Sequence, residues 1–126
     1  MASILIADDE ADVRQFLRTV LQDCGHKVWE ASNGKEAVAL ICRTKFDVVI
    51  TDLAMPEGEG LETIQALKKE HPDLRIIAIS GSIPAVLRIA ERLGAKASLS
   101  KPFSAETVLE TVQRVLGIAK PCPRAE

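Results

Sequence analysis

Residues 4–12 read ILIADDEAD, so the four apolar residues 4–7 run directly into Asp8, Asp9 and Glu10. A short, continuous apolar run is typical of a strand that is buried on both faces. The sequence therefore predicts a first strand that delivers three carboxylates to one point.

The same alternation of short apolar runs and longer helical patterns continues along the chain. Further β-branched or apolar runs predict strands over 28–31, 48–51 and 76–79, with a weaker one over 97–100. Apolar residues at helical spacing lie between and after these runs: Val13, Phe16, Leu17, Val20 and Leu21; Ala37, Leu40 and Ile41; Leu61, Ile64 and Leu67; Val108, Leu109, Val112, Val115 and Leu116. Gly25, Gly94 and Gly117 are expected to close helices, and Ser104 to begin the last one.

Five strands that alternate with five helices predict an α/β fold with a parallel sheet covered on both faces. Right-handed crossovers favour a doubly wound, flavodoxin-like (βα)5 sheet in the order 2-1-3-4-5. Ligands bind such sheets at the carboxyl ends of the strands, between the first and third strands. The third strand ends in VVITD, which places Asp52 beside Asp8 and Asp9.

Composition limits the classes of function. The chain has 126 residues, about one domain, and 16 basic against 18 acidic side chains give a net charge of −2. Neither nucleic acid nor an anionic membrane is favoured as a partner. The absence of a long apolar run or a leader pattern favours a cytoplasmic location. The three cysteines, Cys24, Cys42 and Cys122, are widely spaced and are interpreted as reduced thiols.

Acids that converge on one crevice repel one another unless a cation lies among them. Oxygen ligands without nearby His or Cys suit Mg²⁺, and Mg²⁺ beside a further carboxylate is typical of phosphoryl transfer, with Asp52 as a candidate acceptor. The fourth strand adds the hydroxyl of Ser80 beside Gly81, where a missing side chain leaves room for a phosphoryl group. The fifth adds Lys101, followed by Pro102 as a candidate cis peptide.

Each of these motifs also has a plainer interpretation. The acids after the first strand could cap a helix, Asp52 and Ser80 could lie in turns, and Lys101 could be a solvated loop residue. Their combination favours a site, because all four would have to fall at strand ends on one edge of one sheet.

ILIADDEADVR, DVVITDLAMPEGEGLETI, IIAISGS and GAKASLSKPF together resemble the receiver domain of two-component response regulators, over residues 3–117. The resemblance implies that a histidine kinase or phosphotransfer protein phosphorylates Asp52. It implies Mg²⁺ ligands from Asp9, Asp52 and the carbonyl of Ala54, with Asp8 acting through water. It also implies that Ser80 and Lys101 are the switch hydroxyl and lysine, and that the outward residues of the first helix, Arg14 among them, meet the kinase.

One departure concerns the output. The family commonly has an aromatic switch residue three positions before the lysine, and here that residue is Ser98. The usual switch on the surface formed by the fourth helix, the fifth strand and the last helix is therefore in doubt. A short Pro-containing tail over 118–126 leaves no room for a DNA-binding domain, so a stand-alone receiver without enzyme activity is expected.

Three other functions share part of this pattern. A receiver fold that only docks onto partners stays open because of Ser98. An Mg²⁺-dependent phosphatase with an Asp nucleophile usually has a second acid two residues later, and this chain has Ala54 there. A flavodoxin-like electron carrier is disfavoured because Asp8, Asp9 and Glu10 would repel a flavin phosphate.

Overall fold

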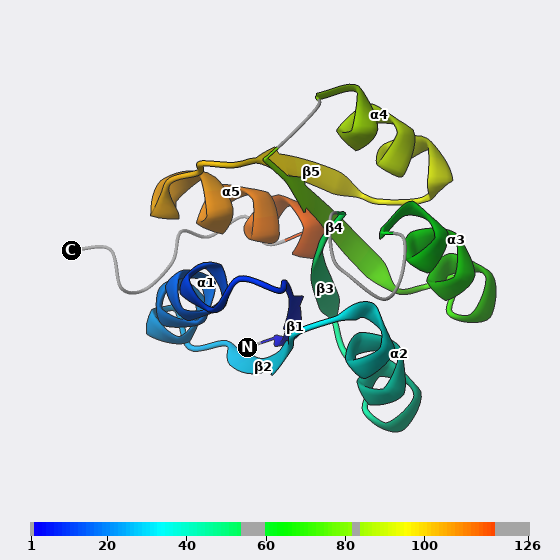
Figure 1. The fold of residues 1–126 in the computed structure, drawn as a ribbon. Helices are drawn as coiled ribbons and strands as arrows, with labels where there is room; N and C mark the ends of the chain where they lie inside the picture. Colours follow the sequence, from blue (N-terminus) through cyan, green and yellow to red (C-terminus); the bar gives the residue numbers. More distant parts are fainter. Residues whose placement is uncertain (1, 54–59, 82–83, 118–126) are drawn as a thin grey trace.

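A five-stranded parallel sheet with helices on both faces forms the structure, a computed structural model that describes residues 2–53, 60–81 and 84–117 (Figure 1). Strands and helices alternate along the chain: β1 Ser3–Ala7, α1 Ala11–Asp23, β2 Lys27–Ala31, α2 Gly34–Arg43, β3 Val48–Asp52, α3 Gly60–Glu70, β4 Arg75–Ser80, α4 Pro84–Leu93, β5 Ala97–Ser100 and α5 Ala105–Leu116. The strand order is β2-β1-β3-β4-β5. The predicted fold class and topology are confirmed.

The central strands are apolar along their whole length because both faces of the sheet are covered. Successive residues of a strand point to opposite faces, so Leu5 and Val49 pack with α2, α3 and α4 while Ile4 and Val48 pack with α1 and α5. Figure 1 shows this division, with α1 and α5 on one side of the sheet and the other three helices opposite. Two separate hydrophobic clusters therefore fix the sheet from both sides.

Helix boundaries follow the predicted signals. The Ser104 side chain accepts a hydrogen bond from the Thr107 N–H and caps α5. Gly25, Gly94 and Gly117 all have positive φ, at 88°, 128° and 76°, which is the region that favours glycine. The three predicted helix ends are confirmed. Among the described residues, no helix combines the length and apolarity that a bilayer crossing requires.

Two residues differ from what the sequence predicts. Phe16 has the helical spacing of the apolar stripe of α1, but 38% of it is exposed and its ring lies 6.2 Å from that of Phe103. Cys24 is disulfide-bonded and is not the reduced thiol that the sequence predicts. Sequence spacing does not show which thiols meet in space. Cys42 is a free, exposed thiol, as expected, and Cys122 lies outside the described residues.

The strand register brings the acids to one edge. Ala7 of β1 pairs with Thr51 of β3, so Asp8 and Asp52 follow neighbouring residues at the carboxyl ends of two adjacent strands. Ser80 of β4 pairs with Ser100 of β5, and Lys101 is the next residue. The topology therefore places Asp8, Asp52, Ser80 and Lys101 at the same edge of the sheet.

Candidate functional site

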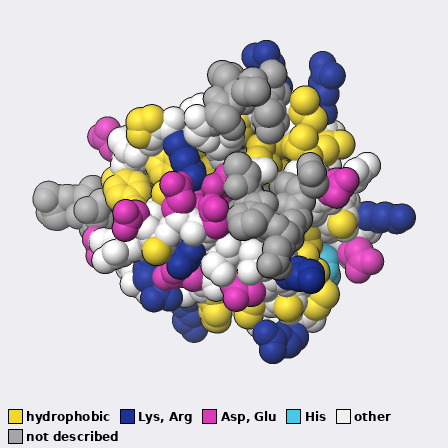
Figure 2. All heavy atoms as spheres, in the orientation of Figure 1, with side chains coloured by type: hydrophobic (Ala, Val, Ile, Leu, Met, Phe, Trp, Pro, Cys, Tyr) yellow, Lys and Arg dark blue, Asp and Glu magenta, His cyan; other side chains and the backbone are white. Residues whose placement is uncertain are grey.

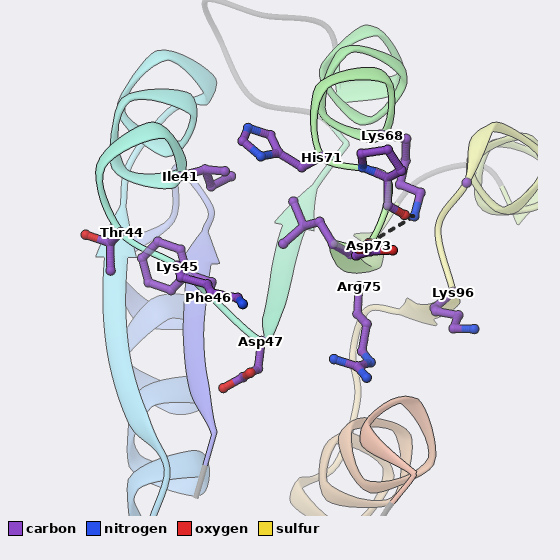
Figure 3. A pocket seen from close by; sticks show the side chains of 13 residues that line it. Ile41, Thr44, Lys45, Phe46, Asp47, Lys68, His71, Asp73, Arg75 and Lys96 are labelled. Atoms are coloured by element: carbon purple, nitrogen blue, oxygen red, sulfur yellow. Dashed lines mark hydrogen bonds between the residues drawn. The ribbon is translucent and has the colours of Figure 1, made fainter.

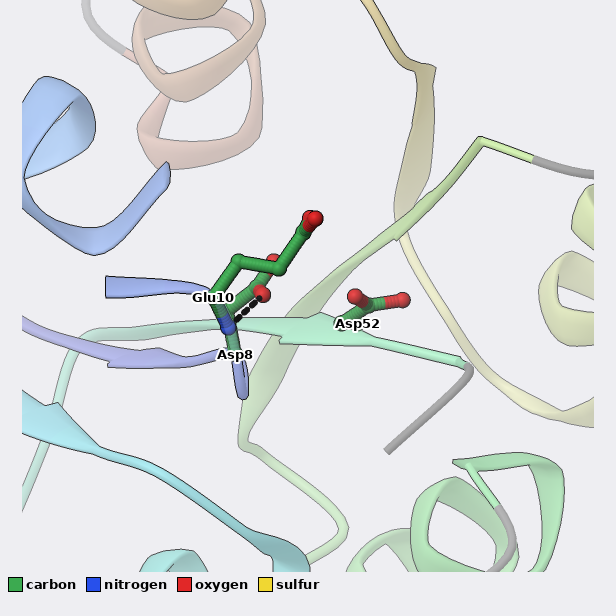
Figure 4. Close-up of side chains that lie close together, drawn as sticks. All are labelled: Asp8, Glu10 and Asp52. Carbon is green, nitrogen blue, oxygen red and sulfur yellow. Dashed lines mark hydrogen bonds between the residues drawn. The ribbon is translucent and has the colours of Figure 1, made fainter. Parts of the chain in front are cut away.

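Three carboxylates converge at the carboxyl end of the sheet. Asp8, Glu10 and Asp52, here called the acidic cluster, each offer an oxygen within 4.8 Å of the others. The Asp8 side chain is fully buried, that of Asp52 is 4% exposed and that of Glu10 is 58% exposed. Figure 4 shows the three side chains at the ends of β1 and β3, with the Glu10 N–H donating to Asp8 Oδ1 at 2.8 Å.

One lysine neutralises part of this negative charge. The Lys101 Nζ lies 2.7 Å from Glu10 Oε1, 2.9 Å from Asp52 Oδ2 and 3.2 Å from Asp8 Oδ2. Its side chain is 18% exposed, so these ion pairs are shielded from most of the solvent. Three carboxylates against one ammonium leave an excess of two negative charges.

The buried position of this cluster shifts two pKa values. Burial raises the pKa of Asp8 from 3.8 to about 6; the Glu10 N–H opposes this shift and the nearby Asp52 adds to it. Burial alone would lower the pKa of Lys101, but its hydrogen bonds to Glu10 and Asp52 outweigh that effect and raise it. Lys101 is therefore charged at neutral pH, and Asp8 keeps its proton to a higher pH than an ordinary aspartate does.

The other two strands place their residues as expected. Ser80 ends β4 and is 3% exposed, and its carbonyl accepts from the Lys101 N–H at 2.8 Å. The Lys101–Pro102 peptide is cis, as predicted. At Gly81, an added Cβ would lie 3.3 Å from Lys101 Cβ, so the lysine stem lies directly beside this glycine. Room for a phosphoryl group at Gly81 stays a prediction.

One predicted ligand is not in the acidic cluster. Asp9 is exposed and is not one of the three converging carboxylates, and Glu10 is there instead. Glu10 has an extended backbone, φ −94° and ψ 115°, and residues two apart in an extended chain lie on the same side. This alternation is the sequence signal that could have placed Glu10, two residues after Asp8, in the cluster. Asp9 as a ligand stays a prediction, and Ala54 lies outside the described residues.

The cluster fits a divalent cation by its chemistry. All three side chains offer oxygen, which hard cations such as Mg²⁺ prefer. Within the described part of the chain, the buried Asp8 Oδ2 makes no hydrogen bond and lies 3.2 Å from the Lys101 ammonium, so it can accept a bond from a cation. The excess of negative charge favours a metal ion over a further neutral ligand.

Comparison with known proteins places this arrangement in a family. The family model for the response regulator receiver domain matches residues 4–113. The chain belongs to the response regulator receiver domain family. It is 36% identical to the chemotaxis protein CheY of Thermotoga maritima, over 89% of this chain and 95% of that one.

Relatives of this receiver domain differ in length. This chain is 36% identical to the DNA-binding transcriptional regulator NtrC of Azospirillum brasilense. The match covers 95% of this chain but only 25% of that protein. Among solved structures, the chemotaxis response regulator CheY4 of Vibrio cholerae superposes with a TM-score of 0.85 at 36% identity, covering 92% of this chain and 99% of that one.

A shallow apolar cavity adjoins the acidic cluster of the receiver domain. It has a volume of about 450 Å³ and lies between α1 and the start of α5, lined by Val13, Phe16 and Phe103 together with Gly81 and Lys101. In the space-filling view, acidic side chains gather near the centre of the face with hydrophobic side chains beside them (Figure 2). Phe16 is exposed because it forms part of this surface.

A larger cavity, of about 750 Å³, lies at the other end of the sheet. Its lining includes Asp47, Arg75 and Lys96, which precede or begin strands, so it is at the amino ends of the strands and away from the acidic cluster (Figure 3). The Lys68 ammonium at its wall donates to the carbonyls of Pro72 and Leu74. Cavity size therefore does not locate the chemistry of this domain.

Ser98 is held by α4. It is half-buried in β5, and its hydroxyl donates to the Glu91 carboxylate at 2.7 Å. The sequence shows that this chain has no aromatic side chain at the switch position. The structure shows that Ser98 instead makes a polar contact between β5 and α4.

Proposed function

We propose that this receiver domain accepts a phosphoryl group on Asp52, in an Mg²⁺-dependent reaction with a histidine kinase or phosphotransfer protein as donor. It acts as a phosphorylated signalling module and not as an enzyme that turns over a substrate. The observation that carries the proposal is the contact of Asp52 with Lys101 at 2.9 Å beside two further carboxylates at adjacent strand ends.

The residues of the site have separable roles in this reaction. An Asp52 carboxylate oxygen forms a bond to phosphorus while the bond from phosphorus to the donor breaks and the donor keeps the electron pair. Mg²⁺, when bound, neutralises charge on the transferred group. Asp8, Asp52 and either Asp9 or Glu10 would hold it through carboxylate oxygens.

Lys101 and Ser80 are placed to respond to the new charge. The Lys101 ammonium contacts three carboxylates at once, so it can exchange one of them for a phosphoryl oxygen without crossing the site. The Ser80 hydroxyl lies at the adjacent strand end and can donate to a second oxygen. These shifts are the proposed link from phosphorylation to the surface.

Output is proposed to involve the surface of α4, β5 and α5. Because Ser98 stands where the family commonly has a ring, breaking its bond to Glu91 is the proposed local change. We further propose a cytoplasmic location, with a protein as the downstream target.

The test is phosphorylation by a small donor. The protein is incubated with acetyl phosphate and Mg²⁺, and intact mass is used to look for one phosphoryl adduct. We expect the adduct in the wild type and in Asp73→Asn, an exposed acid away from the site, and its loss in Asp52→Asn or in excess EDTA. An adduct of equal yield in Asp52→Asn would reject Asp52 as the acceptor.

A further inference from the structure

The Arg14 side chain turns back toward the acidic cluster, contrary to the expectation that it faces outward from α1. Its Nε donates to Glu30 Oε1 at 2.9 Å, and an Nη donates to the main-chain carbonyl of Asp8 at 2.7 Å. Only 19% of the side chain is exposed. One guanidinium thus joins β2 to the segment that connects β1 and α1.

The Asp8 carbonyl lies just beyond the end of the strand pairing. The pairing of β1 with β3 ends at Ala7 and Thr51, and the Asp8 N–H still donates to Ala31 O at 3.1 Å. A carbonyl buried at such a position needs a donor, and a charged donor forms the stronger bond. Arg14 is that donor.

We infer that Arg14 is a positioning residue for the acidic cluster: by holding the Asp8 carbonyl, it fixes the peptide that leads into Asp9 and Glu10. Rotation of that peptide would move the backbone of both acids. The inference rests on the proposed function, because its consequence is a weaker Mg²⁺ site.

Glu30 in turn orients Arg14. Its Oε1 accepts from Arg14, and its Oε2 lies 2.9 Å from the Nε of Arg18. The two arginines thus share one carboxylate, yet only Arg14 reaches Asp8. Arg18 instead donates to the carbonyl of Val28 at 3.4 Å, and 41% of its side chain is exposed.

This difference provides a matched control. Arg14→Met and Arg18→Met each remove one ion pair to Glu30 and keep an apolar stem, so a purely structural role predicts similar effects for both. A positioning role predicts that only Arg14→Met weakens the metal site. Arg14→Lys supplies a second variant, since an ammonium cannot form the two-pronged bridge of a guanidinium.

The experiment is titration with MgCl₂ by isothermal calorimetry, with thermal unfolding of each variant in EDTA. We expect Arg14→Met to raise the Mg²⁺ dissociation constant on the order of tenfold, as for groups that orient a metal ligand. The dissociation constant of Arg14→Lys should lie between those of Arg14→Met and the wild type. That of Arg18→Met should stay within about twofold of the wild-type value, which is the scatter expected for a residue that is not coupled to the site.

Equal dissociation constants for the wild type and both Arg14 variants would overturn the inference while leaving the proposed function intact. An equal rise in Arg14→Met and Arg18→Met would also overturn it, because the Asp8 contact would then be irrelevant. A wild type that binds no Mg²⁺ would refute the proposed function as well.

Discussion

The negative charge of Asp8 is disfavoured by the position of this residue in the fold. Its side chain is fully buried, and burial raises its pKa from 3.8 to about 6. The folded protein therefore binds this proton more tightly than the unfolded chain does. The stability that this gives is fully present below pH 3.8 and is lost as the pH rises through 6.

The first prediction concerns Asp8→Asn, which removes the charge and keeps the size. In EDTA at pH 7.5 we expect the free energy of unfolding to rise by on the order of 1–3 kcal/mol, because a shift of one pKa unit corresponds to 1.36 kcal/mol. Toward pH 4.5 the gain should shrink. Urea unfolding at both pH values measures it; an equal gain at both would refute the electrostatic cause.

Lys101 carries the opposite charge, and its removal is the second prediction. Lys101→Met should lower the free energy of unfolding by about 2–4 kcal/mol at pH 7.5 in EDTA, since it leaves buried carboxylates without their cation. Mg²⁺ should restore part of the loss. The control is Lys45→Met, an exposed lysine at the other end of the sheet. Similar losses in both variants would argue against a special role for Lys101.

At the residue scale, the sequence predicted which strand ends meet but not which way every side chain points. Asp8, Asp52, Ser80 and Lys101 follow from strand ends and topology alone. Glu10 and Arg14 depend on the backbone conformation after β1 and on a side-chain rotamer, which spacing does not encode. For the same reason, the sequence could not show that the Lys101 stem lies directly beside Gly81.

Contact between the ends of β4 and β5 sets the position of the lysine, which gives the third prediction. Gly81→Ala would place a Cβ 3.3 Å from Lys101 Cβ and 3.5 Å from its Cδ. The lysine stem must then shift, and we expect phosphorylation by acetyl phosphate to slow roughly three- to tenfold, because small displacements at a reacting centre are costly. Initial rates of adduct formation measure it. An unchanged rate would show that the stem adapts freely.

The fourth prediction tests the contact between β5 and α4. Ser98→Ala removes the hydrogen bond to Glu91 and should lower the free energy of unfolding by about 1 kcal/mol. Hydrogen exchange of the α4 amides should speed up more than that of α5. Ser98→Thr keeps the hydroxyl and serves as the control. Equal exchange in α4 and α5 would mean that this bond does not tie α4 to the sheet.

At the element scale, strands and helix ends were predictable because their signals are local. Continuous apolar runs, an N-cap serine and glycines at positive φ each act within a few residues. Helical spacing identifies the apolar stripe of α1 but does not show which of its residues lie at the exposed edge of that stripe. Phe16 lies at this edge and faces a cavity beside Phe103. The Cys24 disulfide depends on tertiary proximity, which no local signal reports.

For the whole molecule, two hydrophobic clusters on opposite faces hold the sheet, so its carboxyl edge is a fixed platform. This explains how a domain with a net charge of −2 can concentrate three acids at one point: the sheet supplies the stability that the site gives up. The acidic cluster at this edge is where we propose that the chemistry of the receiver domain takes place.

The most direct measurement of the central claim is a crystal structure with Mn²⁺ in place of Mg²⁺, read by anomalous scattering. We predict one peak at the acidic cluster, about 2.0–2.2 Å from a carboxylate oxygen of Asp52 and within reach of Asp8. Loss of that peak in Asp52→Asn would support the assignment. A peak elsewhere, or none at saturating Mn²⁺, would contradict it.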